Sequence, residues 1–189
     1  MVKLLLLRHA KSAWPDVSDH ERPLAPRGRR DAPAVGRWLL VAGHLPGEIL
    51  CSTAVRARET WQLAQAELGT AAPVRFEESV YQATAEGLLT LIRQTAPGVG
   101  TLLVVGHDPA IPQLALTLAK KSASVGQGGA KAGKPELADP LRRMQVKFPT
   151  AAVAVLESLA AWPQLGSEQA RLLEFITPRD ISGASSGLT

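Results

Sequence analysis

Two short apolar runs, each followed by a histidine, constrain this chain more than any other feature. Residues 2–7 read Val-Lys-Leu-Leu-Leu-Leu and precede Arg8-His9, and residues 100–105 read Gly-Thr-Leu-Leu-Val-Val and precede, after one glycine, His107. Runs of this length and composition are typical of strands buried on both faces of a sheet. Open α/β sheets bind ligands beyond the carboxyl ends of their strands. We therefore expect both imidazoles to lie on the same edge of one sheet.

The rest of the chain alternates between strand-like and helix-like patterns. Short apolar segments predict strands, and apolar residues at helical spacing predict helices. The expected strands are residues 2–7, 48–51, 74–76, 100–105, 152–156 and 172–176, and the expected helices are residues 27–41, 53–68, 85–96 and 110–120. This alternation predicts a three-layer α/β/α sandwich with a mainly parallel sheet.

The length of 189 residues favours a single domain. We expect that domain to span residues 1–181, with a flexible Gly-, Ala-, Lys- and Ser-rich loop over 121–140 and a small, polar, disordered tail over 182–189. Residues 128–134 fit the first part of a P-loop pattern, but Pro135 stands where that pattern needs Ser or Thr. Nucleotide binding there is not expected.

Composition excludes several function classes. The net charge is only +4 and no polybasic run occurs, so we expect no nucleic-acid partner. Cys51 is the single cysteine, which rules out an internal disulfide and favours a cytoplasmic location. No apolar stretch approaches a membrane span, and no metal-binding motif occurs, so neither a membrane nor a metal or other cofactor is expected. His20 and His44 follow no predicted strand and are expected in solvated positions, and the oligomeric state stays open, with a monomer compatible.

Arginines accompany the two strand-end histidines. Arg8 precedes His9 directly, and Arg56 lies at the start of the helix expected after the second strand, with Ser52 or Thr53 as its N-cap. A helix start offers free N–H groups, and guanidinium groups match the geometry of phosphate oxygens. The pattern predicts a phosphate-binding site built around an imidazole.

Four motifs follow one another between residues 7 and 109. They are Leu-Arg-His-Ala-Lys-Ser at 7–12, Asp-His-Glu-Arg-Pro-Leu at 19–24, S-x-x-x-R-A-x-x-T at 52–60 and Val-Val-Gly-His-Asp-Pro at 104–109. This ordered set resembles the histidine phosphatase superfamily, which includes the phosphoglycerate mutases, and within it the SixA-type phosphohistidine phosphatases.

The resemblance implies a phosphoglycerate mutase-like fold and a metal-independent phosphatase. His9 would be the phosphorylated nucleophile, and Arg8, Arg56 and His107 would complete the phosphate pocket. Repulsion from the two arginines is expected to lower the pKa of His9 and so keep its imidazole neutral. The segment between Arg56 and His107 is short, which implies an open site that admits a phosphorylated protein side chain.

The chain departs from the R-H-G-x-T pattern of the small-molecule phosphatases and mutases. Lys11 and Ser12 stand in that segment and are expected to contact the substrate. The acid that protonates the leaving group has two candidates, Glu78 and Asp108. A phosphoramidate depends less on that acid, because its nitrogen can be protonated beforehand, and this favours phosphohistidine in a partner protein as substrate.

Two alternatives remain open at this point. The first is a broad-specificity phosphatase or mutase-like enzyme for small phosphorylated substrates, which requires a working general acid. The second is a phosphopeptide-binding module without activity. The complete set of Arg8, His9, Arg56 and His107 favours an enzyme over the binding module.

Overall fold

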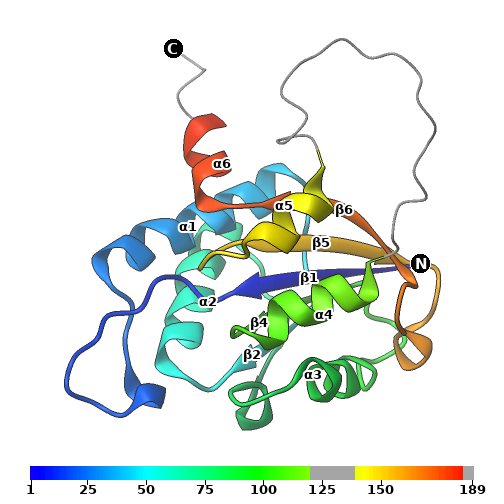
Figure 1. The fold of residues 1–189 in the computed structure, drawn as a ribbon, viewed down its shortest axis with the longest axis horizontal. Coiled ribbons are helices and arrows are strands. Elements are labelled where there is room, and N and C mark those ends of the chain that lie inside the picture. Colours follow the sequence, from blue (N-terminus) through cyan, green and yellow to red (C-terminus); the bar gives the residue numbers. More distant parts are fainter. Residues whose placement is uncertain (120–138, 185–189) are drawn as a thin grey trace.

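The computed structural model describes residues 1–119 and 139–184, and these residues build one sheet covered by helices on both faces (Figure 1). Its strands are β1 (Val2–Arg8), β2 (Glu48–Ser52), β3 (Val74–Glu77), β4 (Thr101–Gly106), β5 (Val153–Ser158) and β6 (Ala170–Ile176). They lie in the order β3-β2-β4-β1-β5-β6. Strands β1 to β4 are parallel, β5 is antiparallel to β1, and β6 is antiparallel to β5. The mainly parallel sheet and the α/β class are confirmed.

The helices are α1 (Pro26–Val41), α2 (Val55–Leu68), α3 (Ala85–Ile92), α4 (Ala110–Leu118), α5 (Pro140–Val146) and α6 (Pro178–Ala184). The leucine run of β1 is buried on both faces because its side chains alternate between the two helical layers. Leu5 and Leu7 share one hydrophobic cluster with residues of α1 and α2. Leu4 and Leu6 share the other with residues of α3, α4 and α5. Figure 1 shows α3, α4 and α5 on one side of the sheet, with α1 and α2 on the other.

The pair α1 and α2 packs unusually closely at Gly36. A Cβ atom built on Gly36 would lie 2.1 Å from the carbonyl oxygen of Ala64 in α2. No side chain can occupy that position without moving one helix away from the other. The glycine therefore sets the distance between α1 and the helix that carries Arg56.

Several element boundaries differ from those expected. Helix α2 begins at Val55. Its N-cap is Ala54, which makes no side-chain cap hydrogen bond, so the prediction of Ser52 or Thr53 as the cap was wrong. Helix α5 was not expected, although Asp139 caps it through the Leu141 N–H. Helix α6 extends to Ala184, so the first residues of the expected tail are helical. Residues 120–138, which hold most of the expected loop and the P-loop-like segment, lie outside the described residues, as do residues 185–189.

His44 is buried, and its expected solvated position was wrong. Gly43 has a φ of +71°, and this left-handed turn directs the chain back against the sheet. The His44 imidazole then reaches Glu174 of β6, with 2.9 Å between Nε2 and Oε1, and lies against Trp38. Its role here is to connect α1 to the edge strand.

The helices in the described ranges include none with the length and apolar character that a membrane-spanning segment needs.

Candidate active site

Strand register brings the two strand-end histidines together. In the parallel pair β1 and β4, Arg8 lies opposite Gly106, so the next residue of each strand is a histidine. The His9 N–H donates to the carbonyl of Gly106 over 2.9 Å, and the two imidazole centroids are 5.0 Å apart. Both side chains are buried, with 8% of His9 and 7% of His107 exposed. The expected proximity of the two imidazoles is confirmed.

The tautomer of His9 follows from the hydrogen bond of its ring nitrogen Nδ1. Nδ1 lies 2.7 Å from the carbonyl oxygen of Ala10. Since a carbonyl oxygen only accepts, Nδ1 carries the proton, and Nε2 keeps a lone pair. Burial lowers the pKa of His9 to about 4, and repulsion from Arg56 and Arg8 adds to that effect. The expected repulsion from the two arginines is therefore present, but burial contributes more to the shift.

His107 has a hydroxyl partner that the sequence did not reveal. Its Nε2 lies 2.7 Å from Oγ of Ser52, at the end of β2. The Ala54 N–H donates to the same oxygen over 3.2 Å, which leaves the hydroxyl proton of Ser52 free to donate to Nε2. In that arrangement neutral His107 carries its proton on Nδ1, a buried atom without a hydrogen-bond partner among the described residues. Burial, with a smaller effect from His9, lowers the pKa of His107 to about 3.

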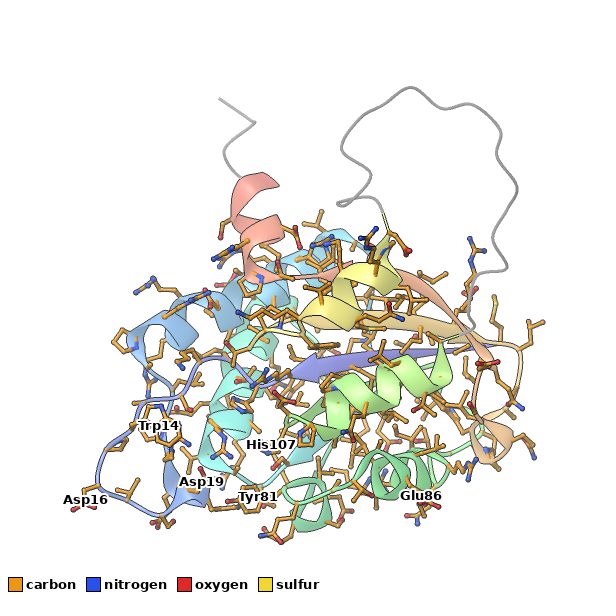
Figure 2. All side chains as sticks on the ribbon, viewed as in Figure 1. Trp14, Asp16, Asp19, Tyr81, Glu86 and His107 are labelled. Atoms are coloured by element: carbon orange, nitrogen blue, oxygen red, sulfur yellow. The ribbon has the colours of Figure 1, made fainter. Side chains whose placement is uncertain are left out.

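Arg56 enters this pocket from the first turn of α2, and Asp19 holds it there. Its guanidinium donates to the carbonyl of Asp19 and, over 2.9 Å, to Oδ2 of the same residue. The Tyr81 hydroxyl donates to that oxygen over 2.7 Å. Figure 2 shows Asp19 and Tyr81 together at the end of the sheet where His107 lies. The hydrogen bonds from Tyr81, Arg22 and Arg56 hold the pKa of Asp19 far below its usual range.

Arg22 is a second buried arginine beside Arg56, and it was not among the site residues expected from the sequence. Its guanidinium donates to Oγ of Ser12 and to Oδ1 of Asp19, each over 2.7 Å. The indole of Trp14 covers the group, with 3.2 Å between Cζ and the ring centroid. The residue belongs to the 19–24 motif, so the signal was present. Ser12, expected to contact substrate, is buried and accepts this hydrogen bond from Arg22.

Arg8 has partners of its own, separate from the Asp19 contacts that hold Arg56. It donates to the carbonyl of Phe148 over 2.7 Å and forms an ion pair of 3.0 Å with Asp108. Its Nε is buried and has no partner among the residues that the structure describes. Both contacts use Nη1, so the guanidinium is held at one end of its fork while the Nε donor stays available.

The two candidate general acids lie at the surface. Asp108, with 45% of its side chain exposed, pairs with Arg8. Glu78, with 72% exposed, accepts a hydrogen bond from the Thr53 hydroxyl and lies 3.5 Å from Nε2 of His20. His20 also contacts the Tyr81 ring, so it is closer to the pocket than the expected solvated loop position. Within residues 1–119 and 139–184, no aspartate or glutamate is buried.

Thr60 connects the loop after His9 to α2. The Ala10 N–H donates to the Thr60 hydroxyl over 2.9 Å, and that hydroxyl donates to the carbonyl of Arg56 over 2.6 Å. One buried side chain therefore fixes the backbone on both sides of the pocket. Lys11, by contrast, is exposed and lines a surface cavity together with Arg8. The described residues contain no cluster of three or more His, Cys, Asp or Glu side chains suited to a metal ion.

Comparison with known proteins agrees with this geometry. The family model of the histidine phosphatase superfamily, branch 1, matches residues 4–81. The uncharacterized protein Rv1276c of Mycobacterium tuberculosis is 41% identical over 174 residues, which are 92% of this chain and all of the relative. The structure of a proposed phosphohistidine phosphatase SixA from Nakamurella multipartitia is 33% identical with a TM-score of 0.74, and covers 94% of this chain and 96% of that one. The corresponding Agrobacterium tumefaciens protein is 26% identical with a TM-score of 0.71, over 94% and 98% of the two chains.

Proposed function

The chain belongs to the histidine phosphatase superfamily, and on that premise we propose that this phosphohydrolase removes phosphate from phosphohistidine in a partner protein. The proposed route passes through a phospho-His9 intermediate and uses no metal. The structural relatives with the SixA description support the substrate class.

The observation that carries this proposal is a pocket of two neutral imidazoles and three arginines without a buried carboxyl group. Loss of a general acid typically slows hydrolysis of an alkyl phosphate by about 10² to 10⁴. A phosphohistidine can leave as a neutral imidazole, because its ring nitrogen can be protonated before the P–N bond breaks, whereas an alkyl ester without a general acid must leave as a strongly basic alkoxide. The exposed positions of Glu78 and Asp108 therefore fit a phosphoramidate better than a phosphoester.

In the first step, Nε2 of His9 attacks phosphorus in line with the substrate P–N bond. That bond breaks, its electron pair stays on the substrate imidazole, and solvent supplies the proton. Arg8, Arg22 and Arg56 neutralise the phosphoryl oxygens, and Nδ1–H of His107 donates to one of them. In the second step, water attacks phospho-His9, the new P–N bond breaks, and inorganic phosphate leaves with Nε2 restored.

The proposal is tested by comparing kcat/KM for a phosphohistidine peptide with kcat/KM for p-nitrophenyl phosphate and 3-phosphoglycerate. We expect the phosphohistidine peptide to be preferred by at least about 10². Labelled phosphate should be trapped on the wild-type protein and not on His9→Asn. Turnover by His9→Asn contradicts the covalent route.

A small-molecule phosphatase has one observation in its favour, the position of Asp108 beside Arg8 at 3.0 Å. This second function predicts rapid phosphoester hydrolysis that collapses by about 10² or more in Asp108→Asn. If Asp108→Asn retains its activity and phosphoesters stay slow, the second function is excluded. Phosphate binding without turnover of any substrate indicates a binding module instead.

A further inference from the structure

A basic groove opens beside the catalytic pocket. It is a cavity of about 670 Å³, half of whose lining residues are lysine or arginine. Arg8 lines it together with Lys11, Arg27, Arg142, Arg143, Lys147 and Arg179. These cations come from four separate stretches of sequence, so they form no polybasic run and could not be predicted as a cluster from the sequence. Because Arg8 belongs to both, the groove is continuous with the phosphate pocket.

Four of these cations are available to a ligand. Arg8 pairs with Asp108, Arg27 with Asp31 and Arg143 with Asp180. The others, Lys11, Arg142, Lys147 and Arg179, are exposed and have no carboxylate partner within the described ranges. A cluster of unpaired cations around a cavity generates a positive potential that attracts anions.

The groove already accommodates one carboxylate of the chain itself. Oδ2 of Asp180 lies 2.5 Å from the Arg143 guanidinium, and accepts hydrogen bonds of 2.8 Å from the N–H and from the hydroxyl of Thr177. Asp180 is also the one acidic residue in the described lining. This contact shows the geometry by which the groove binds a carboxylate, and it leaves the four cations above unpaired.

We propose that the basic groove binds acidic residues that flank the phosphorylated side chain of a protein substrate. This inference rests on the proposed function and names the chemistry of its substrate. A polypeptide fits better than a compact polyphosphate because the free cations are exposed and distributed over α5 and the residue after it, α6 and the loop after β1. Between them the groove presents apolar surface from Val146 and Pro149, which suits side chains that alternate between acidic and apolar.

The experiment compares two phosphohistidine peptides of equal length, one with Glu and Asp flanks and one with Gln and Asn flanks. Wild-type protein should hydrolyse the acidic peptide with a kcat/KM about tenfold higher at low ionic strength, and the preference should shrink in salt. The double variant Arg142→Gln/Arg179→Gln should lose most of that preference. The matched control Lys3→Gln/Arg171→Gln removes the same amount of charge at the start of β1 and β6, and should keep the preference for the acidic peptide.

A binding measurement separates this inference from the proposed function. A fluorescent, unphosphorylated acidic peptide should bind wild type and the control, and bind Arg142→Gln/Arg179→Gln at least about fivefold more weakly. Absence of phosphohistidine turnover with this binding pattern intact overturns the proposed function alone. The proposed role of the basic groove is overturned if wild type hydrolyses both peptides equally. It is also overturned if the double variant binds the acidic peptide as well as wild type does. Displacement of the labelled peptide by tripolyphosphate or single-stranded DNA, but not by an excess of unlabelled acidic peptide, also overturns it.

Discussion

The protonation of His9 gives the sharpest quantitative prediction. A solvated histidine has a pKa near 6.5, whereas burial lowers that of His9 to about 4. At pH 5, about nine tenths of His9 should therefore be neutral, against roughly one thirtieth of an unperturbed histidine. The nucleophile then stays competent well below the pH at which most histidine nucleophiles are lost.

The assay is an NMR titration of the histidine Cε1–H signals between pH 3 and pH 8, with assignments from His9→Asn and His107→Asn. We expect the signals of His9 and His107 to stay at their neutral positions down to pH 5. A midpoint near 6.5 for His9 refutes the reasoning, because it means that burial in the folded protein does not exclude the proton.

The same pKa values have a consequence for stability. The folded pKa of each histidine lies below its unfolded value, so the unfolded chain binds more protons between about pH 6.5 and pH 4. The free energy of unfolding should fall as the pH falls through that range, by about 1.6 kcal/mol for each histidine between pH 6.5 and pH 5. Urea denaturation at both pH values measures it. The His9→Asn/His107→Asn double variant is the control, and an equal loss in that variant assigns the effect to other groups.

Three further substitutions test the packing and the pocket. Gly36→Ala should lower the free energy of unfolding by about 1–3 kcal/mol, measured in urea, because its Cβ meets the carbonyl of the facing helix at 2.1 Å; an unchanged midpoint contradicts the close approach. Thr60→Val should lower the free energy of unfolding by about 1–3 kcal/mol and lower kcat, because it leaves the buried Ala10 N–H without an acceptor, and Thr60→Ser should restore both quantities. Asp19→Asn should tighten inhibition by inorganic phosphate about threefold to tenfold, because the carboxylate that occupies Arg56 loses its charge; weaker inhibition means that Asp19 mainly positions the arginine.

The central strands and the two histidines were predictable because they depend on local signals. A buried strand needs a short apolar run, and parallel strands end at one edge of the sheet, so Val2–Arg8 and Thr101–Gly106 carried His9 and His107 with them. Arg56 was predictable for a similar reason, since it opens the helix after β2.

The partners of these residues were not predictable, because they depend on distant contacts. The contact between Ser52 and His107 depends on the pairing of β2 with β4, and that hydroxyl looked like a helix cap in the sequence. Arg22 lies in a polar loop, where an arginine is normally solvated, and becomes buried only because Trp14 folds over it. The prediction for His44 was wrong for the same reason: a turn residue is usually exposed, but this turn folds back onto β6.

The adjacency of β1 and β4 separates the chemistry from the choice of substrate. The imidazoles are attached to the two central strands of the sheet, and backbone pairing fixes their relative position. The loop after β1, helix α5 and the start of α6 surround them without taking part in that pairing. Sequence change in these outer segments can therefore alter what is recognised while leaving the reacting nitrogen in place. One rigid pair of strands can in this way serve a series of related enzymes that differ only in the surface around it.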